Sequence, residues 1–273
     1  MRYIMTLLAV LCSTGWYVQA ENIRPIIDAH IHYSQDAWSL LPPPEAIRVL
    51  RQAGLHKAFV SSSSDDGTQM LHKEAPDLII PVLRPYRTRG EIGTWTRDAS
   101  VIEHVEARLR AHTYAGIGEF HVNGADADLP VMRRMVQLAK QYRIFLHAHA
   151  DSDAVERLFA QEPEARVLWA HAGFTGPEQV RAMLSKYPYL WCDLAFRSEH
   201  ATGGQVDRQW KQLFLDFPER FMLGTDTFTP ERWHYVIEHA KGAQQWLRDL
   251  PAEVADNIAF RNAERLATWA LKR

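Results

Sequence analysis

The chain has 273 residues, of which 47% are hydrophobic and 23% are charged, and its formal net charge at pH 7 is −2. This composition excludes a disordered or fibrous protein and is sufficient for a large buried core in one or two domains. The balanced charge and the lack of a long basic run argue against a nucleic-acid partner, so we expect a small-molecule partner.

The first twenty residues differ in character from the rest of the chain. Arg2 supplies a positive charge, residues 4–12 form an apolar run, and Val18-Gln19-Ala20 resembles a cleavage site. This pattern predicts a secretory signal peptide over residues 1–20. The apolar run is shorter than the roughly 20 residues of a membrane span, so we expect no membrane association after cleavage. Cys192 is then the one remaining cysteine, and export without a disulfide suggests a bacterial periplasm.

From residue 21 onward, short apolar runs alternate with amphipathic stretches, which is typical of βα units and a parallel sheet. The predicted strands are Pro25–His32, His56–Ser62, Leu78–Arg84, Ala115–Val122, Arg143–His149, Ala165–His171, Tyr189–Phe196 and Arg220–Asp226. The predicted helices are Pro44–Ala53, Ala99–His112, Pro130–Gln141, Ala154–Ala160, Pro177–Tyr187, Gln209–Phe217 and Trp233–Ala240, before a helical tail from Pro251 to Lys272.

Eight βα units in about 250 residues predict an α/β fold of the (β/α)8 TIM-barrel type, with residues 21–273 forming a single domain. A doubly wound open sheet is disfavoured because no glycine-rich phosphate-binding turn follows the first strand. The longest connections, Ser63–Asp77 and Tyr86–Asp98, are expected to be loops over the barrel mouth.

The first predicted strand ends in Asp28-Ala29-His30-Ile31-His32. Successive side chains of a strand alternate between its faces, so His30 and His32 point the same way and offer half of a metal site. Such a pair is short enough to arise by chance, and hydrogen-bonded histidines at a strand end explain it equally well. The other strand ends must therefore decide between these readings.

Active sites of such barrels lie at the carboxyl ends of the strands. The predicted strand ends carry His30, His32, Glu119, His121, His147, His149, His171 and Asp226, which include six of the thirteen histidines. Each histidine alone fits a buried structural role, but together they favour a site for a divalent metal such as zinc. Water on zinc has a pKa near 7 instead of about 15.7, and Asp226 is placed to act as the general base.

Three motifs resemble the amidohydrolase superfamily, which comprises metal-dependent hydrolases on a (β/α)8 barrel. They are Asp28-Ala29-His30-Ile31-His32, Ala170-His171-Ala172-Gly173 and Gly224-Thr225-Asp226. The tail Asn262-Ala263-Glu264-Arg265-Leu266 is similar to the closing helix of the amidohydrolase-related group, often called amidohydrolase family 2. The resemblance spans the chain from Ile26 to about Leu266.

The resemblance implies that His30 and His32 bind metal, that His171 is a ligand or an electrophile, and that Asp226 is the metal-bound base. The family has one histidine on the fifth strand, and either His147 or His149 can fill that position. Phe145-Leu146-His147 matches the apolar-apolar-histidine pattern of the family, which slightly favours His147.

The number of metal ions depends on Glu119. The segment Gly116-Ile117-Gly118-Glu119-Phe120 resembles the fourth strand of the TatD-type branch, where a glutamate bridges two ions. Many members of family 2 hold one ion instead, so one and two ions both remain open. Zinc is the expected metal, with manganese and iron as alternatives. A structural ion pair between Glu119 and Arg84 is the competing interpretation of this carboxylate.

Arginines follow two of the predicted strands: Arg84 and Arg87 come after the third strand and Arg197 after the seventh. Guanidinium groups bind carboxylates and phosphates through paired hydrogen bonds, so we expect a small anionic substrate held by these arginines, with His121 nearby. In the alternative interpretation the arginines fasten loops by pairing with Asp65, Asp66 or Asp193.

The predicted function is a metal-dependent hydrolase in which a metal-bound hydroxide attacks an ester, lactone or amide carbonyl. The alternative implied by the resemblance is a nonoxidative metal-dependent decarboxylase of a small aromatic or unsaturated acid. A non-enzymatic metal-binding or solute-binding protein is a third hypothesis, which the presence of Asp226 argues against.

Overall fold

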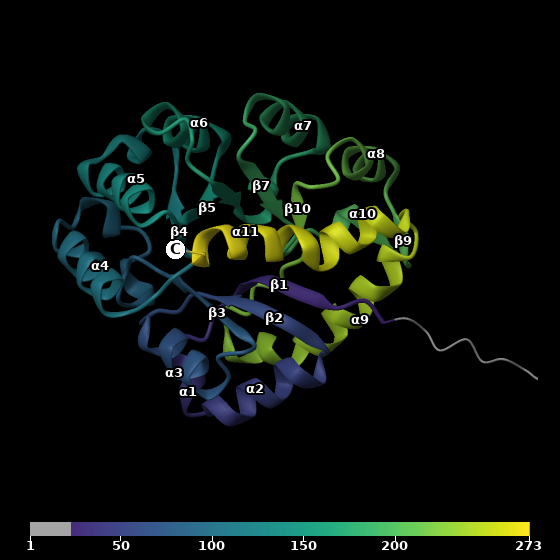
Figure 1. Cartoon of the computed structure of the whole chain (residues 1–273), viewed down its shortest axis with the longest axis horizontal. Helices are drawn as coiled ribbons and strands as arrows, with labels where there is room; N and C mark the ends of the chain where they lie inside the picture. The colour runs from purple at the N-terminus through teal and green to yellow at the C-terminus, as the bar shows by residue number, and fades with distance from the viewer. Residues whose placement is uncertain (1–22, 273) are drawn as a thin grey trace, which may run out of the picture.

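The computed structural model describes residues 23–272, so the predicted signal peptide lies outside the described residues. The described chain forms a barrel of eight parallel strands surrounded by helices (Figure 1). The strands are β1 (Ile26–Ile31), β2 (Leu55–Val60), β3 (Ile79–Leu83), β4 (Gly116–Val122), β5 (Phe145–Ala150), β6 (Val167–Trp169), β7 (Leu190–Asp193) and β10 (Phe221–Met222), and they follow one another in chain order. This arrangement confirms the predicted (β/α)8 fold.

The barrel closes between its last and first strands. The N–H of Ala29 donates to the carbonyl of Leu223 at 2.8 Å, and the N–H of Asp226 donates to the carbonyl of His30 at 2.7 Å. Asp226 therefore lies beside β1 although β10 ends at Met222. All residues of β1 and β3 are buried, as expected for parallel strands covered by helices on the outside and by packed side chains within.

Helices follow the strands on the outside of the barrel. They are α1 (Gln35–Trp38), α2 (Pro43–Gln52), α3 (Asp66–Glu74), α4 (Ser100–Ala111), α5 (Pro130–Tyr142), α6 (Ser152–Gln161), α7 (Pro177–Lys186), α8 (Arg208–Asp216), α9 (Val236–Leu247), α10 (Ala252–Asp256) and α11 (Asn262–Leu271). A short hairpin of β8 (Ala201–Thr202) and β9 (Gln205–Val206) precedes α8. The predicted helix Trp233–Ala240 starts later than expected, because Pro230–Tyr235 forms a 3-10 turn before α9.

One predicted loop is wrong: Ser63–Asp77 contains helix α3 instead of a loop over the mouth. The glycine inside α3 lowers the helix propensity of a short segment, which hides the helix in the sequence. The structure explains this glycine, since a Cβ atom at Gly67 would lie 2.0 Å from the carbonyl oxygen of Tyr33. Close packing thus requires the residue that weakens the helical signal.

The other long connection, Tyr86–Asp98, lies at the carboxyl end of β4. Its Trp95 donates from Nε1 to the carbonyl of His121 at 2.9 Å. Two short 3-10 turns, Arg89–Glu91 and Trp95–Arg97, occur within it. This loop therefore covers the end of β4, where the sequence predicts the site residues Glu119 and His121.

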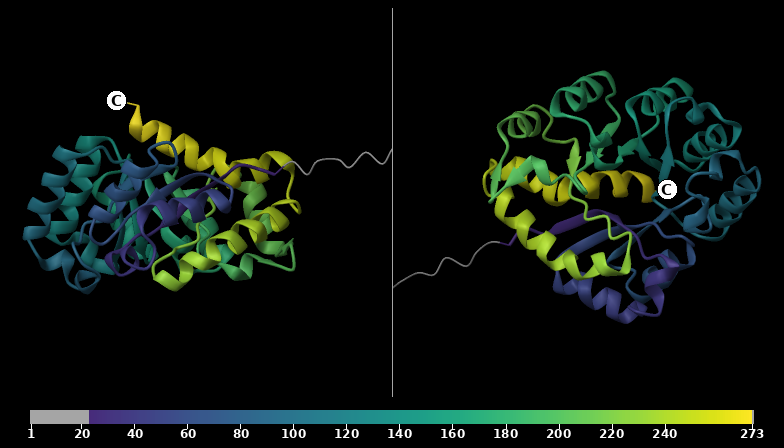
Figure 2. Two further views of the ribbon diagram at one scale, coloured as in Figure 1. Left: turned by 90° about the horizontal axis from the view of Figure 1, so that it is seen from below. Right: turned by 180° about the vertical axis from the view of Figure 1, so that it is seen from behind.

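The C-terminal helices cover the amino end of the barrel, as Figures 1 and 2 show for α11. Asn262 donates from Nδ2 to the carbonyls of Pro218 at 3.1 Å and Phe221 at 2.8 Å, just before and at the start of β10. The carboxyl ends of the strands lie at the other end. Among residues 23–272, no helix combines the length and the apolar character that a membrane span requires.

Candidate metal centre

Six of the predicted site residues converge at the carboxyl end of the barrel. They are His30 and His32 at the end of β1, Glu119 on β4, His149 on β5, His171 after β6 and Asp226 after β10. All except His149 are buried, with exposed fractions between 1% and 7%. We call these six residues the metal cluster.

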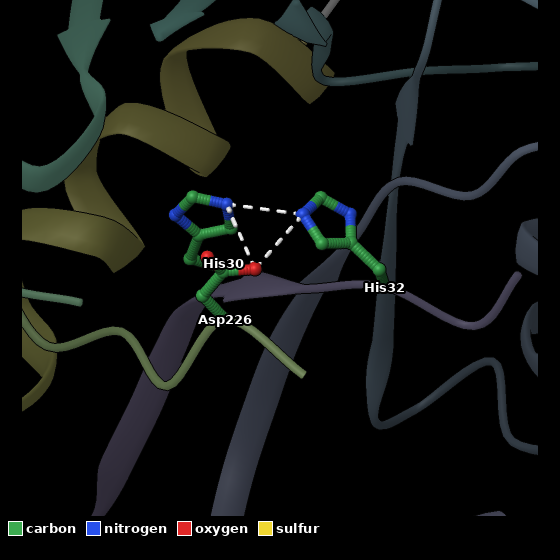
Figure 3. A group of neighbouring side chains, drawn as sticks. All are labelled: His30, His32 and Asp226. Carbon is green, nitrogen blue, oxygen red and sulfur yellow. Dashed lines mark hydrogen bonds and ion pairs between the residues drawn. The ribbon is translucent and has the colours of Figure 1, made fainter. Parts of the chain in front are cut away.

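The first part of the metal cluster consists of His30, His32 and Asp226, whose polar atoms point toward one another (Figure 3). The Nε2 atoms of the two histidines are 3.1 Å apart, and Oδ1 of Asp226 lies 3.3 Å from that of His32 and 3.8 Å from that of His30. Ligand atoms about 2.0–2.2 Å from one tetrahedral zinc ion lie roughly 3–4 Å apart. Oδ1 of Asp226 is buried without a hydrogen-bond partner, so a cation would satisfy it.

Glu119 lies between this group and a second group, which consists of His149 and His171. Its Oε2 is 3.2 Å from Nε2 of His32, and its Oε1 is 3.5 Å from Nε2 of His30. The same Oε1 lies 2.9 Å from Nδ1 of His149 and 3.5 Å from Nε2 of His171. Because its two oxygens face both groups, this carboxylate is placed to contact two ions.

Hydrogen bonds hold three of the histidine rings so that Nε2 faces the cluster. His32 donates from Nδ1 to the carbonyl of Ser61 at 2.6 Å, and His171 donates from Nδ1 to that of Ala195 at 2.9 Å. His30 donates from Nδ1 to Oδ2 of Asp193 at 3.2 Å. Such bonds fix the tautomer and leave the other nitrogen as a lone-pair donor, as in metal-binding histidines.

The electrostatics of the cluster favour a cation. Burial alone lowers the pKa of His30, but the nearby carboxylates of Asp193, Glu119 and Asp226 outweigh it and hold that pKa well above its usual value. Burial raises the pKa of Asp226, yet electrostatic attraction from His30 and His32 lowers it to about 2. The carboxylates are therefore ionised, and their field attracts a positive charge.

Comparisons with known proteins show the family of the chain. The sequence model of the amidohydrolase family matches residues 27–266. The chain belongs to this family. No curated protein sequence matches the chain significantly.

Solved structures share the fold at low sequence identity. A protein from Pseudomonas putida with the provisional name 2-pyrone-4,6-dicarboxylic acid hydrolase has a TM-score of 0.62 at 14% identity, covering 90% of this chain and 98% of that one. An amidohydrolase from Burkholderia multivorans with bound HEPES has a TM-score of 0.57 at 15% identity, with coverages of 89% and 99%. The TatD homologue YjjV of Escherichia coli K12 has a TM-score of 0.54 at 16% identity, with coverages of 92% and 96%. These likenesses show the TIM-barrel fold. The family match supports a metal-dependent hydrolase.

The two histidines of β5 have different partners in this amidohydrolase. His149 contacts Glu119, as described above, and is half-buried. His147 is buried and its Nε2 lies 2.9 Å from Oδ2 of Asp193. His147 therefore lies in a group of candidate ligands with His30 and Asp193, whereas His149 lies beside Glu119 in the metal cluster. The slight preference for His147 stays a prediction.

Asp193, at the end of β7, is a site residue that the sequence interpretation missed. Its Oδ2 accepts from His30 and His147, and its Oδ1 accepts the backbone N–H groups of His171 at 3.1 Å and Ala195 at 3.0 Å. The signal was present, because an acid follows the buried run of the seventh strand. The sequence interpretation considered this acid only as a partner for arginines.

Asp28 lies between the first strand and the segment after β10. Its Oδ1 accepts the backbone N–H of His30 at 3.0 Å. Its carboxylate also accepts from the N–H and the hydroxyl of Thr225, at 3.1 and 2.7 Å. Asp28 thus joins the first strand to the segment after β10, while Asp193 orients the ring of His30.

Replacing Asp193 with asparagine should weaken zinc binding about 10- to 100-fold, the usual effect of losing a partner that orients a ligand. An amide cannot accept hydrogen bonds from His30, His147 and two backbone groups as this carboxylate does. The dissociation constant is measured by competition with a chelating dye. Asp249→Asn, which removes a surface pair with Lys211, is the control. An unchanged zinc affinity in Asp193→Asn would contradict this role.

The predicted arginines are engaged with protein acceptors. Nη2 of Arg84 pairs with Oε2 of Glu119 at 2.8 Å, so the competing ion pair is present alongside the contacts of Glu119 with histidines. Arg87 pairs with Glu91 at 2.9 Å and Asp98 at 2.7 Å. The loop-fastening role of Arg87 is thus supported, although its partners differ from those expected.

Arg197 donates from Nη1 to the carbonyl of His171 at 2.8 Å and from Nη2 to that of Thr175 at 2.6 Å. It therefore fastens the turn that carries His171. The acids Asp65 and Asp66 pair with Arg108 instead of with the predicted arginines. His121 is the remaining residue of the expected substrate-binding set.

His121 lies beside the cluster. Its ring stacks on His149 with the ring centroids 4.1 Å apart, and Tyr86 donates from its hydroxyl to Nδ1 of His121 at 2.9 Å. A cavity of about 470 Å³ lies between β10, α9 and the hairpin β8–β9. Phe196 and Arg197 line it, but none of the six cluster residues does. The convergent ligand atoms, and not this cavity, mark the candidate active site.

Proposed function

We propose that this amidohydrolase hydrolyses an ester, lactone or amide bond of a small molecule with the help of one or two divalent ions, zinc being the expected metal. The observation that carries the proposal is the convergence of two imidazole Nε2 atoms on the unpartnered Oδ1 of Asp226. His30, His32 and Asp226 would hold one ion, and His149 with His171 would hold a second. Glu119 would contact both.

A bound divalent metal supplies a Lewis acid for the carbonyl oxygen and lowers the pKa of a water molecule. Asp226 accepts the proton of the attacking water as the water oxygen bonds to the carbonyl carbon. It then returns that proton to the leaving alcohol or amine as the carbon–oxygen or carbon–nitrogen bond breaks. The hydrogen bond from its backbone N–H to the carbonyl of His30 holds Asp226 beside the ligands.

We also propose that the enzyme acts after export, because residues 1–20 have the pattern of a signal peptide. A fusion of these residues to a reporter that is active only in the periplasm tests this part. Reporter activity that requires residues 1–20 supports export, and equal activity without them contradicts it.

The function is tested by incubating the zinc-loaded protein with esters, lactones and amides. The similar protein from Pseudomonas putida is named as a hydrolase of 2-pyrone-4,6-dicarboxylic acid, so this lactone is a suitable test substrate. We expect a new acid without release of CO2, loss of turnover on chelation and recovery on addition of zinc. Release of CO2 would instead establish decarboxylation, and a panel without turnover would contradict hydrolysis of these bonds.

A further inference from the structure

Three of the eleven phenylalanines are exposed, and all three follow strands at the carboxyl end of the barrel. Phe174, Phe196 and Phe228 have exposed fractions of 56%, 42% and 38%. They follow β6, β7 and β10, close to where the chain supplies His171 and Asp226. We call these three residues the phenylalanine rim.

Phe174 and Phe196 contact the cluster, and Phe228 packs against Phe196. The ring of Phe174 stacks on that of His171 with centroids 4.4 Å apart and planes 19° apart, and it lies 5.7 Å from the ring of His149. The ring of Phe196 lies 6.1 Å from that of His171 and 5.7 Å from that of Phe228. The exposed aromatic surface is therefore adjacent to the atoms proposed to hold metal.

The backbone at two rim positions is unfavourable for phenylalanine. Phe174 has φ of 51° and Phe196 has φ of 56°, both in the left-handed region that bulky side chains rarely adopt. Such conformations cost free energy and concentrate at functional sites. Exposure of a large apolar ring is also unfavourable, so neither residue is explained by stability of the fold.

The ring of Phe196 is held in place from one side. The guanidinium carbon of Arg232 lies 3.8 Å from its centroid, and the same guanidinium donates to the backbone carbonyls of Thr225 and Asp226. An aromatic ring anchored in this way offers a preorganised surface for another flat ring.

We propose that the phenylalanine rim binds an aromatic group of the substrate next to the bond that is cleaved. This inference rests on the proposed function, because it takes the metal cluster as the reacting centre. It differs from the expectation of an anionic group held by Arg84, Arg87 or Arg197, whose donors already bind protein acceptors. Stacking and apolar contact, instead of an ion pair, would then determine which substrates bind.

The test uses two metal-binding probes that differ in their side group, benzohydroxamate and acetohydroxamate. Their dissociation constants are measured by calorimetry on the zinc-loaded protein and its variants. We expect benzohydroxamate to bind more tightly, and Phe174→Ala and Phe196→Ala each to reduce its advantage by about tenfold. Acetohydroxamate should bind all proteins equally. Leu215→Ala, which removes an exposed side chain on α8, is the matched control.

Phe174→Gly provides a second variant, since glycine adopts a left-handed φ readily and should fold at least as stably as the wild type. It should show the same loss for benzohydroxamate. An unchanged ratio of the two affinities in all three rim variants would overturn the inference while leaving the proposed metal site intact. Failure of both probes to bind the zinc-loaded wild type would instead contradict the proposed function itself.

Discussion

Asp226→Asn is expected to lower kcat/KM for the hydrolysed substrate by about 10²- to 10⁴-fold, the range for loss of a general acid–base group. Asparagine has nearly the same shape and keeps one oxygen that can face His30 and His32. Its amide cannot accept the proton of the attacking water or return it to the leaving group. The fold should be retained, because the backbone N–H at this position still donates to the carbonyl of His30.

Steady-state kinetics on the zinc-loaded variant, with zinc content determined on the same sample, separate loss of the base from loss of the metal. Asp216→Asn is the matched control, since Asp216 pairs with Arg181 on the outer helices. It should retain wild-type kinetics. A zinc-loaded Asp226→Asn enzyme with wild-type kcat/KM would remove Asp226 from the reaction.

Glu119→Gln is expected to reduce the bound zinc from two ions to one and to lower kcat with it. In the structure the carboxylate oxygens of Glu119 face His32 on one side and His149 with His171 on the other. A neutral amide is a poor metal ligand and cannot bridge two ions. Glutamine retains a carbonyl oxygen for Arg84, so the buried guanidinium keeps an acceptor.

Elemental analysis of gel-filtered protein measures the number of zinc ions bound per protein chain. Glu106→Gln, which alters a surface pair with Arg134, is the control and should bind as much zinc as the wild type. One ion in both wild type and Glu119→Gln would show that Glu119 does not bridge a pair. Two ions in both would show that other residues hold the second ion.

The sequence was sufficient to predict the barrel and the convergence of the cluster. The alternation of apolar runs and amphipathic helices specifies parallel strands, and their carboxyl ends must meet at one end of a barrel. Residues as distant in the chain as His30 and Asp226 could therefore be placed together without knowledge of any contact.

Details that depend on depth within the barrel could not be predicted in this way. His147 and His149 share a face of β5, and periodicity does not tell which one reaches the cluster. The answer depends on Asp193, which lies on β7 and contacts both His30 and His147. Helix α3 was also missed because of a contact between segments. Its Gly67 lies so close to the carbonyl of Tyr33 that no side chain fits there, and this requirement is not visible in the sequence.

The partners of the arginines could not be predicted from the sequence either. A guanidinium after a strand can face substrate or fasten a loop, and the sequence does not distinguish these roles. Arg87 takes its partners from within its own loop, whereas Arg197 binds backbone carbonyls of the turn that carries His171. Every residue has a backbone carbonyl, so the sequence does not indicate which one an arginine binds. The role of Arg197 in fastening this turn is therefore visible only in the structure.

We propose that the two histidines of β1 and Asp226 hold a metal ion. In crystals grown with zinc, an anomalous difference map recorded at the zinc absorption edge should show a peak about 2.0–2.2 Å from Nε2 of His30, Nε2 of His32 and a carboxylate oxygen of Asp226. If crystals that contain zinc give no peak between these atoms, the two histidines and Asp226 do not hold the ion.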